Sequence, residues 1–554
     1  MQQNKTCKTC SATFEVAQED KRFYKLFDVP EPLACPTCRI KRRMLERNTR
    51  HLYKRKCDAT GKEIISQYHE DHAFPVYETE YWWSDKWDAI DFGKDQGLDF
   101  ERPFFEQFAE LKTRTPHVST YVVGGTLQNS EYTNCTGYLK NCYMIFEADY
   151  NEECYYSNRI YHSISCVDCL HMYKSELCYE CRDCQNCYNL RYSNDCENCI
   201  DSHFLSNCKS CKDCIACINL RHKRYYILNK PHSKEEYEAE LKRLNPTTLN
   251  KIIALQTQAQ AFFSTQPHKN LQQEHNENCF GDYLYNSKDA YYCFDSKDLE
   301  DCRYCARVSM TIKDSMDYTG WGSQVSLMYQ CAACGDHSYN LKFCTTCTTD
   351  NSDLEYCDQC TGCSNCFGCI SLKRKSNCIL NRQYTPEEYT SLKARLIKHM
   401  RATGEYSEFF PASLAPFGYN ESIAPEYFPL TKEEALAQDF KWTEHDTTSL
   451  PQTYKVPEQI KDVQDKIIEE TLLCKQCKKN FRIIPQELAF YRRQKLPIPT
   501  SCTNCRHYAR IALKNPKEFY NILCAKCGKD TVTTYPPEKH LQIFCEECYK
   551  AYVN

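Results

Sequence analysis

Glycine is scarce in this chain, with 15 residues in 554, and no apolar run is long enough to cross a bilayer. The low glycine count and the mean hydropathy of -0.69 argue against collagen-like and membrane classes. No charged and then apolar leader follows Met1, so we expect a cytoplasmic protein with no membrane contact. A phosphate-binding loop, a nucleophile elbow and a paired carboxylate motif are also missing, and no enzymatic activity is expected.

Cysteine is the abundant residue, with 42 copies that stand mostly in Cys-x-x-Cys pairs. Because the cysteines of a cytosolic chain are kept reduced, we expect paired thiols to be metal ligands or buried thiols rather than disulfides. The chain is too long for one core, so several domains are expected. Its 41 tyrosines and 26 phenylalanines supply the aromatic surface for packed structure.

The net charge of -4 conceals a strong asymmetry. Residues 1–56 hold 14 basic and 6 acidic side chains, or +8, and residues 472–554 hold 15 and 6, or +9, which leaves -21 for the middle. Basic ends of this kind are suited to a polyanion. The alternative is two solvated basic surfaces that balance an acidic middle.

A module occurs twice, at an ungapped offset of 467 residues. Both copies read Cys-x2-Cys-x24-Cys-x2-Cys, and Arg39, Arg43 and Tyr53 fall on Arg506, Arg510 and Tyr520. Four thiolates at this spacing close a tetrahedron around Zn²⁺, and a closed shell is structural because no position is open for water. The predicted ligands are Cys7, Cys10, Cys35 and Cys38 in the first copy and Cys474, Cys477, Cys502 and Cys505 in the second. The alternative is plain buried thiols.

A second ribbon follows each copy. Cys524, Cys527, Cys545 and Cys548 form a third complete quartet, so about three zinc ions are expected. In the N-terminal copy Cys57 remains, while Thr60, Glu78 and Tyr81 hold the other ligand positions. We predict that this ribbon has lost its metal and is held by aromatic packing that includes Trp82, Trp83 and Trp87. A rescued site that adds His69 and His72 to Cys57 is the alternative.

The first module resembles a known family. Its Cys-x2-Cys pair, Phe14, Phe23-Tyr24 and the run Cys-Pro-Thr-Cys-Arg-Ile-Lys-Arg-Arg at 35–43 resemble the probable zinc-ribbon domain of bacterial proteins of unknown function. The whole chain, including residues 81–88 and 426–430, is similar to the uncharacterised multi-zinc-ribbon proteins of small-genome, candidate-phylum bacteria. This resemblance implies zinc ribbons and brings no activity with it. The degenerate ribbon departs from the four-cysteine pattern.

The middle contains a second duplication, at an offset of 152 residues, in which Cys208 and Cys217 fall on Cys360 and Cys369. Each half ends in a helix with a capping box, Ser233-x-x-Glu236 and Thr385-x-x-Glu388. Cysteines recur every 12 residues in the first half, as at 142, 154, 166 and 178, and every 13 in the second, as at 331, 344 and 357.

A repeat this short cannot hold two helices, and it fits a narrow β-solenoid whose end the following helix caps. Small thiols suit its thin interior. Three states are open for these ladder cysteines: reduced and packed, bound to further zinc or another soft metal, or linked in disulfide ladders.

The predicted fold class is mainly β with small α, with zinc ribbons at both termini around two cysteine-rich β-solenoid halves. The predicted segments are a zinc ribbon at 1–50, a degenerate ribbon at 51–95, a connector at 96–130, the first solenoid half and its helix at 131–247, a helix and linker at 248–276, the second half and its helix at 277–400, a connector at 401–470, a zinc ribbon at 471–520 and a C-terminal zinc ribbon at 521–554.

Our first functional prediction is nucleic-acid binding, RNA ahead of DNA, through the basic ribbon ends. Helical spacing from Arg39 to Arg50 would line guanidinium groups along one face for phosphate contacts. The predicted contact residues are Arg39, Arg42, Arg43, Arg47, Arg50, Lys54, Arg55, Arg492, Arg493, Arg506 and Arg510. Four tyrosines, Tyr24, Tyr53, Tyr491 and Tyr520, would stack on unpaired bases.

Two other functions stay open from the sequence. One is a protein-interaction scaffold, in which a long acidic, tyrosine-rich solenoid offers the surface to a protein partner. The other is a metal store or redox protein that uses the cysteine ladders. The oligomeric state is not indicated.

Overall fold

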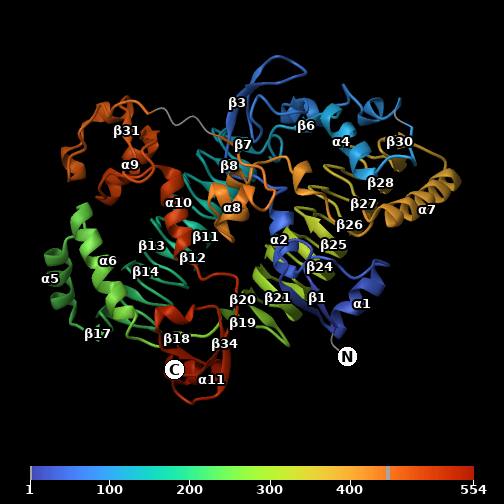
Figure 1. Ribbon diagram of the computed structural model, residues 1–554. Helices are drawn as coiled ribbons and strands as arrows, with labels where there is room; N and C mark the ends of the chain where they lie inside the picture. The colour runs from blue at the N-terminus through green and yellow to red at the C-terminus, as the bar shows by residue number, and fades with distance from the viewer. Residues whose placement is uncertain (1–2, 96, 445–448, 554) are drawn as a thin grey trace. The chain divides into compact units, whose positions relative to one another are not determined.

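A computed structural model describes residues 3–95, 97–444 and 449–553 of the protein (Figure 1). The chain forms two units, each built from two stretches that are far apart in sequence. Unit 1 contains Met1–Thr120 and Leu271–Thr443, and unit 2 contains Tyr121–Asn270 and Glu444–Asn554. The N-terminal cysteine module therefore folds with the second half of the middle region, and the C-terminal module folds with the first half.

Unit 2 holds a stack of short strands that we call the first stack. Its parallel strands are β7 (Leu127–Gln128), β8 (Asn134–Lys140), β9 (Phe146–Glu152), β10 (Asn158–Tyr161), β11 (Leu170–Tyr173), β12 (Arg182–Gln185), β13 (Tyr188–Arg191), β14 (Ile200–His203), β15 (Lys212–Ile215) and β16 (Arg224–Ile227), and β17 (Lys230–Pro231) closes it antiparallel. Leu170 pairs with Asn158 and with Arg182, so the register equals the 12-residue period of the sequence.

A three-residue repeat lies beneath this period. Every third residue from 135 to 228 has a positive φ, as in Tyr138 (57°), Asn141 (54°) and Met144 (49°). None of these residues is β-branched, which matches the steric cost of the left-handed region for such side chains. From position 136 to position 217 the residue after each one, such as Leu139, Cys142 and Ile145, is buried in the interior of the stack. Four such inward side chains fill each 12-residue repeat.

Unit 1 holds the second stack. Its strands are β19 (Gln273–Glu274), β20 (Phe280–Tyr285), β21 (Lys288–Lys297), β22 (Leu299–Arg303), β23 (Ala306–Val308), β24 (Ile312–Trp321), β25 (Val325–Ala332), β26 (Tyr339–Lys342), β27 (Ser352–Glu355), β28 (Ser364–Phe367), β29 (Ser376–Ile379) and the antiparallel β30 (Arg382–Gln383). The register is 13 from Leu299 to Ile312 and 12 from Ser352 to Ser364. Strands β21 to β24 close a four-strand ring.

Each stack is followed by the helix that the sequence predicts. Helix α5 (Lys234–Leu244) begins at a capping box formed by Ser233 and Glu236, and α7 (Pro386–Thr403) begins at Thr385 and Glu388. These helices pack against the last parallel strands, β16 and β29. In unit 2, α5 is followed by α6 (Leu249–Phe263) and β18 (His268–Lys269).

The two cysteine modules have the same element order. The first has β1 (Gln3–Thr6), β2 (Thr13–Val16), α1 (Gln18–Leu26), α2 (Pro36–Met44), β3 (Tyr53–Lys56), β4 (Glu63–Ser66), β5 (Val76–Tyr77) and α3 (Thr79–Trp83), and the second has β31 (Leu472–Leu473), β32 (Asn480–Phe481), α9 (Pro485–Gln494), α10 (Thr503–Ala512), β33 (Tyr520–Leu523), β34 (Asp530–Thr533), β35 (Ile543–Phe544) and α11 (Glu546–Val553). The bounds of β33 and β34 are those of β3 and β4 moved by 467 residues, as the self-match predicts.

The remaining elements are short. Unit 1 adds η1 (Ala89–Phe92), α4 (Phe104–Arg114), β6 (His117–Val118), η2 (Ala412–Leu414), η3 (Tyr419–Glu421), η4 (Ala424–Glu426) and α8 (Lys432–Leu436), and unit 2 adds η5 (Ile460–Asp462), η6 (Asp465–Ile468) and η7 (Pro537–Lys539). The prediction of a mainly β chain with small helices is confirmed, and the structure shows that the strands of the two stacks pair mostly in parallel. None of the helices in the described ranges combines the length and the apolar character that a membrane crossing requires.

Candidate metal centres

Four tight turns carry the first cysteine of each ribbon, and their backbones hydrogen-bond alike. The amide of Cys7 donates to the carbonyl of Ala12 (2.9 Å), and that of Cys474 donates to Lys479 (2.9 Å). Cys57 and Cys524 make the same bonds to Lys62 and Lys529. Each turn passes through a left-handed residue, namely Ser11, Gly61, Lys478 and Gly528. This backbone directs amide groups toward the cysteine sulfur.

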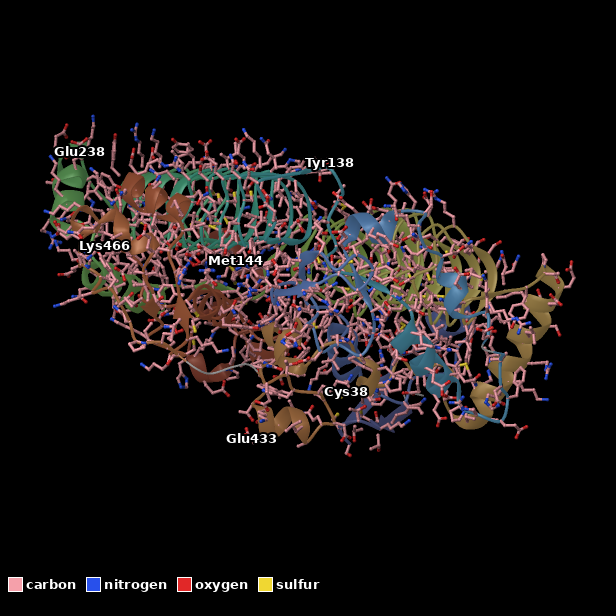
Figure 2. The ribbon with its side chains drawn as sticks, turned by 90° about the horizontal axis from the view of Figure 1, so that it is seen from above. Cys38, Tyr138, Met144, Glu238, Glu433 and Lys466 are labelled. Atoms are coloured by element: carbon pink, nitrogen blue, oxygen red, sulfur yellow. The ribbon has the colours of Figure 1, made fainter. Side chains whose placement is uncertain are left out.

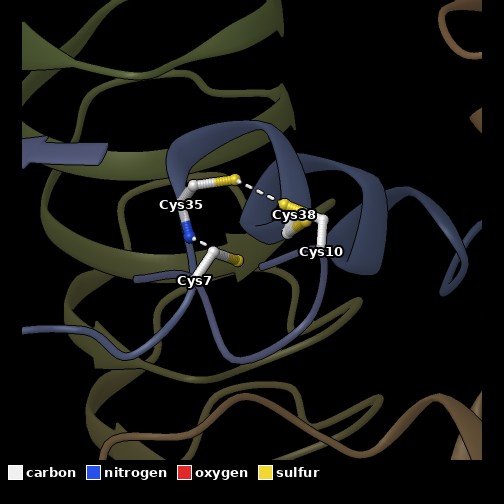
Figure 3. Close-up of side chains that lie close together, drawn as sticks. All are labelled: Cys7, Cys10, Cys35 and Cys38. Carbon is white, nitrogen blue, oxygen red and sulfur yellow. Dashed lines mark hydrogen bonds between the residues drawn. The ribbon is translucent and has the colours of Figure 1, made fainter. Parts of the chain in front are cut away.

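In each complete quartet the four Sγ atoms lie within 4.8 Å of one another. Figure 3 shows Cys7, Cys10, Cys35 and Cys38 directed toward one point. The Sγ atoms of Cys10 and Cys35 are 3.8 Å apart. The matching separations are 3.7 Å in the second quartet and 3.8 Å in the third. A regular tetrahedron with bonds of about 2.3 Å to the metal has an edge of about 3.8 Å, so the three quartets fit one metal ion each.

Backbone amides also favour the thiolate form that a metal needs. Cys35 N donates to Cys7 Sγ (3.2 Å), and Cys502 N donates to Cys474 Sγ (3.3 Å). Burial opposes ionisation of Cys474, but these amide bonds outweigh it and lower the pKa of the thiol to about 6. The same balance lowers the pKa of Cys524 to about 6. The predicted quartets are therefore assembled and chemically suited to bind a metal.

The degenerate ribbon keeps the frame without the ligands. Cys57 is buried, and its Sγ accepts from the amide of Glu78 at 3.3 Å, the bond that Cys545 N makes to Cys524 Sγ. Within the described residues, Cys57 belongs to no group of three or more ligand side chains. His72 Nε2 bonds to the carbonyl of Pro416 instead (2.5 Å). Trp82 is buried and packs against Trp83 and Trp87.

This arrangement gives a prediction for metal stoichiometry. Replacing Cys57 by serine should leave the zinc content of the full chain unchanged, because no group of metal-ligating side chains among the described residues includes Cys57. Replacing Cys524 should lower the content by one ion. Native mass spectrometry of both variants checks this, and loss of an ion from Cys57→Ser would show that the ribbon holds metal.

The ladder cysteines lie inside the stacks, and none of the 42 cysteines, all of which the structure describes, is joined in a disulfide. Cys208 Sγ donates to the carbonyls of Ser206 (3.4 Å) and Cys217 (3.5 Å), one in its own repeat and one in the next. Cys360 repeats this pattern with Asp358 and Cys369. Across the part of the chain that the structure describes, no ladder cysteine joins a group that could hold a metal. The described geometry is that of reduced, packed thiols.

The helix that follows the first quartet anchors its module to the second stack. Arg39 Nε donates to Asp317 Oδ2 (2.8 Å), and Arg43 Nη1 donates to Asp317 Oδ1 (3.0 Å). All three side chains are almost fully buried. Tyr304 OH donates to Asp20 Oδ2 in the preceding helix α1 (2.9 Å), and the Arg39 guanidinium lies over the Tyr304 ring. In Figure 1, α2 lies beside β24 and β25.

The second quartet is anchored to the first stack by the equivalent groups. Arg506 Nε donates to Asp168 Oδ1 (3.0 Å), and Arg510 Nη1 lies 3.2 Å from the same oxygen. Tyr156 OH donates to Glu487 Oε2 (2.9 Å), and Glu487 is the counterpart of Asp20 at the offset of 467. Burial alone would lower the pKa of Arg506, and the Asp168 carboxylate raises it above its usual value. One docking arrangement is thus used twice.

These contacts correct the predicted nucleic-acid interface. The expectation that Arg39, Arg43, Arg506 and Arg510 face solvent is wrong, because all four are buried. Helix α2 ends at Met44, so the predicted helical row does not reach the later arginines. Arg50 and Arg55 are buried. Arg42 forms an ion pair with Glu408, and Arg47 is half-buried. Lys54, Arg492 and Arg493 are exposed, with Arg492 paired to Asp465.

The predicted stacking tyrosines are also placed differently. Tyr24 and Tyr491 are buried and pack edge-on against stack residues Tyr329 and Tyr179. The Tyr53 hydroxyl donates to Glu421, and that of Tyr520 donates to Glu518 (3.0 Å). The expectation that Tyr24 and Tyr491 are open to bases is wrong, because their rings are the contact surface between module and stack.

Comparison with known proteins adds little. No protein-family model matches the chain, and no curated protein matches it. Among solved structures, the chain is similar to a putative acetyltransferase from Desulfovibrio desulfuricans G20, with 9% sequence identity over 48% of this chain and 75% of that chain. The TM-score of 0.10 is too low for this likeness to carry an argument.

Proposed function

We propose that this protein is a non-enzymatic scaffold in which three zinc ions shape small ribbon modules and each main module locks onto a narrow β-solenoid. The observation that carries the proposal is the repeated docking: in both modules the arginines in the helix after the quartet form ion pairs with a buried aspartate of a stack. Zinc would then have a structural role. By binding the cysteines it would fix the helices at residues 36–44 and 503–512 in the position from which their arginines reach the stack.

Zinc is the metal that this donor set favours. Four cysteine thiolates in a closed tetrahedral shell are typical of structural Zn²⁺, whereas Ca²⁺ and Mg²⁺ need oxygen ligands. We expect Cys7, Cys10, Cys35 and Cys38 to hold the first ion and the two C-terminal quartets to hold the others. The ion would stabilise the module and leave no open position for substrate.

The solenoid part of the proposal is supported by the parallel register of 12 and 13 residues and by one left-handed residue in every three. Such a stack offers a long, regular outer surface. On the first stack, Tyr138 and Tyr150 are half-exposed and their rings lie parallel at 4.4 Å. Figure 2 places Tyr138 at the edge of this stack. A long, regular surface of this kind is better suited to binding another protein than to enclosing a small ligand, which supports the scaffold role.

The docking contacts favour a protein partner over nucleic acid, because most of the arginines predicted to contact phosphate are enclosed. At low salt, gel shifts of the zinc-loaded protein with single-stranded RNA or with duplex DNA should show no retention at micromolar concentration. The zinc count of the same sample by native mass spectrometry should be three. Retention that weakens steeply with salt would contradict the proposal.

A further inference from the structure

One face of the N-terminal module is closed by a later segment of unit 1. Met44 and Leu45, at the end of α2, are 0% and 2% exposed. They form one cluster with Ala415, Tyr419, Ile423, Ala424, Ala435 and Phe440, which all lie within residues 412–440. The amide of Ile423 donates to the carbonyl of Arg47 (2.9 Å), and Glu421 accepts from the Tyr53 hydroxyl. Figure 1 shows α8 of this segment beside α2.

The same face exists in the C-terminal module. Ile511, Ala512 and Tyr520 stand at the positions of Met44, Leu45 and Tyr53. The local frame is alike, because Asn48 Nδ2 donates to the carbonyl of Gln67 (3.0 Å) and Asn515 Nδ2 donates to Thr534 Oγ1 (3.2 Å), at matching positions. The equivalence therefore extends from the helix end to the following hairpin.

The face of the C-terminal module is exposed, whereas the equivalent face of the N-terminal module is covered by residues 412–440. Ala512 is exposed, and Leu513 beside it is 52% exposed. Within the described residues, none of the hydrophobic clusters includes Ile511 or Leu513. Residues 451–468 of unit 2 pack on α9 instead, where Arg492 donates to the carbonyl of Val463 (2.8 Å). No described segment of unit 2 repeats the role of residues 412–440.

We propose that the face formed by Ile511, Ala512, Leu513 and Tyr520 is a docking site for a protein segment with the chemistry of residues 412–440: small apolar and aromatic side chains, with a carboxylate that replaces Glu518 as the acceptor of the Tyr520 hydroxyl. The closed face of unit 1 shows the occupant that such a surface accepts. Residues 472–554 carry a charge of +9, of which Arg506 and Arg510 are buried against stack carboxylates, and the remaining positive charge favours an acidic segment. This inference rests on the proposed scaffold function and names the kind of partner.

The test uses the full-length, zinc-loaded protein and a synthetic peptide of residues 412–440 as the probe. Fluorescence anisotropy should show saturable binding of the labelled peptide, and a photo-crosslinker at Ile423 of the peptide should mark α10 or β33. Ala512→Arg should weaken binding about tenfold, because a long cation replaces the small side chain at the centre of the face. Tyr520→Phe, or Glu421→Gln in the peptide, should weaken it about fivefold.

Ala551→Arg is the matched control, since Ala551 is also an exposed helical alanine of unit 2 and lies on α11. It should leave the affinity unchanged, and all variants should retain three zinc ions. The inference is overturned if the peptide does not bind at about 1 mM, or if Ala512→Arg binds it as wild type does. It is also overturned if sedimentation shows a wild-type dimer that Ala512→Arg makes monomeric, because the occupant is then a second copy. If the purified full-length protein contains no zinc, that result contradicts the proposed scaffold function instead of the docking inference.

Discussion

Replacing Asp317 by asparagine is expected to lower the free energy of unfolding of unit 1 by about 3 to 5 kcal/mol. Asp317 is fully buried and receives two arginines, and burial already lowers the pKa of Arg43. Without the carboxylate, two guanidinium groups stay enclosed with no opposite charge. Urea unfolding should report the loss, and hydrogen exchange should place it in α2 and in strands β24 and β25.

Two comparisons make this result specific. Arg22→Gln breaks the ion pair with Asp301, in which Arg22 is mostly exposed, and should cost less than about 1 kcal/mol. Asp168→Asn should reproduce the large effect in unit 2, with lost protection in α10 and unchanged protection in α2. A small effect at both buried aspartates would mean that the modules are held by something other than the arginine contacts.

Removal of zinc with a strong chelator is expected to release both modules while the stacks keep their strands. Structural zinc contributes about 10 to 16 kcal/mol per site in small ribbons, which is more than such a module gains from its own core. The stack interiors are filled by buried side chains, and within the described residues none of their cysteines belongs to a group that could hold a metal. Protection should therefore fall in α1, α2, α9 and α10 and persist in β11 and β27.

The order of zinc release is a further part of this expectation. Three of the four cysteines in the first quartet are buried, whereas in the second Cys474 is buried, Cys502 and Cys505 are half-buried and Cys477 is exposed. The first quartet should lose its ion last, because the chelator reaches exposed sulfur first. Mass spectrometry during chelation measures the order through peptides alkylated at the freed cysteines. Simultaneous unfolding of modules and stacks, or early loss from the first quartet, would contradict the account.

Local patterns predicted several features well. The three quartets, the helix starts at Ser233 and Thr385 and the 12-residue register all follow from short spacings, which the backbone expresses directly. The three-residue repeat was also present in the sequence, because the cysteines from 142 to 217 are all separated by multiples of three. The 12-residue period conceals this shorter repeat, because each 12-residue coil contains four of these triplets.

The docking contacts could not be predicted from local patterns. Arg39 meets Asp317 across 278 residues, and Arg506 meets Asp168 across 338. A run of arginines behind a zinc quartet has the same composition whether it binds phosphate or a buried carboxylate. The identity of the partner decides between them, and the partner lies in the other half of the chain. For the same reason, local patterns do not identify Asp20 and Glu487 as docking residues.

The central claim is that the terminal thiolate quartets bind zinc and thereby shape the modules that pack against the stacks. Native mass spectrometry of full-length protein purified without oxygen, combined with alkylation of its cysteines, tests this claim most directly. The account predicts a mass of the folded chain plus three zinc ions, with no disulfide. A folded chain that carries no metal, or one whose quartet sulfurs are joined in pairs, would contradict it.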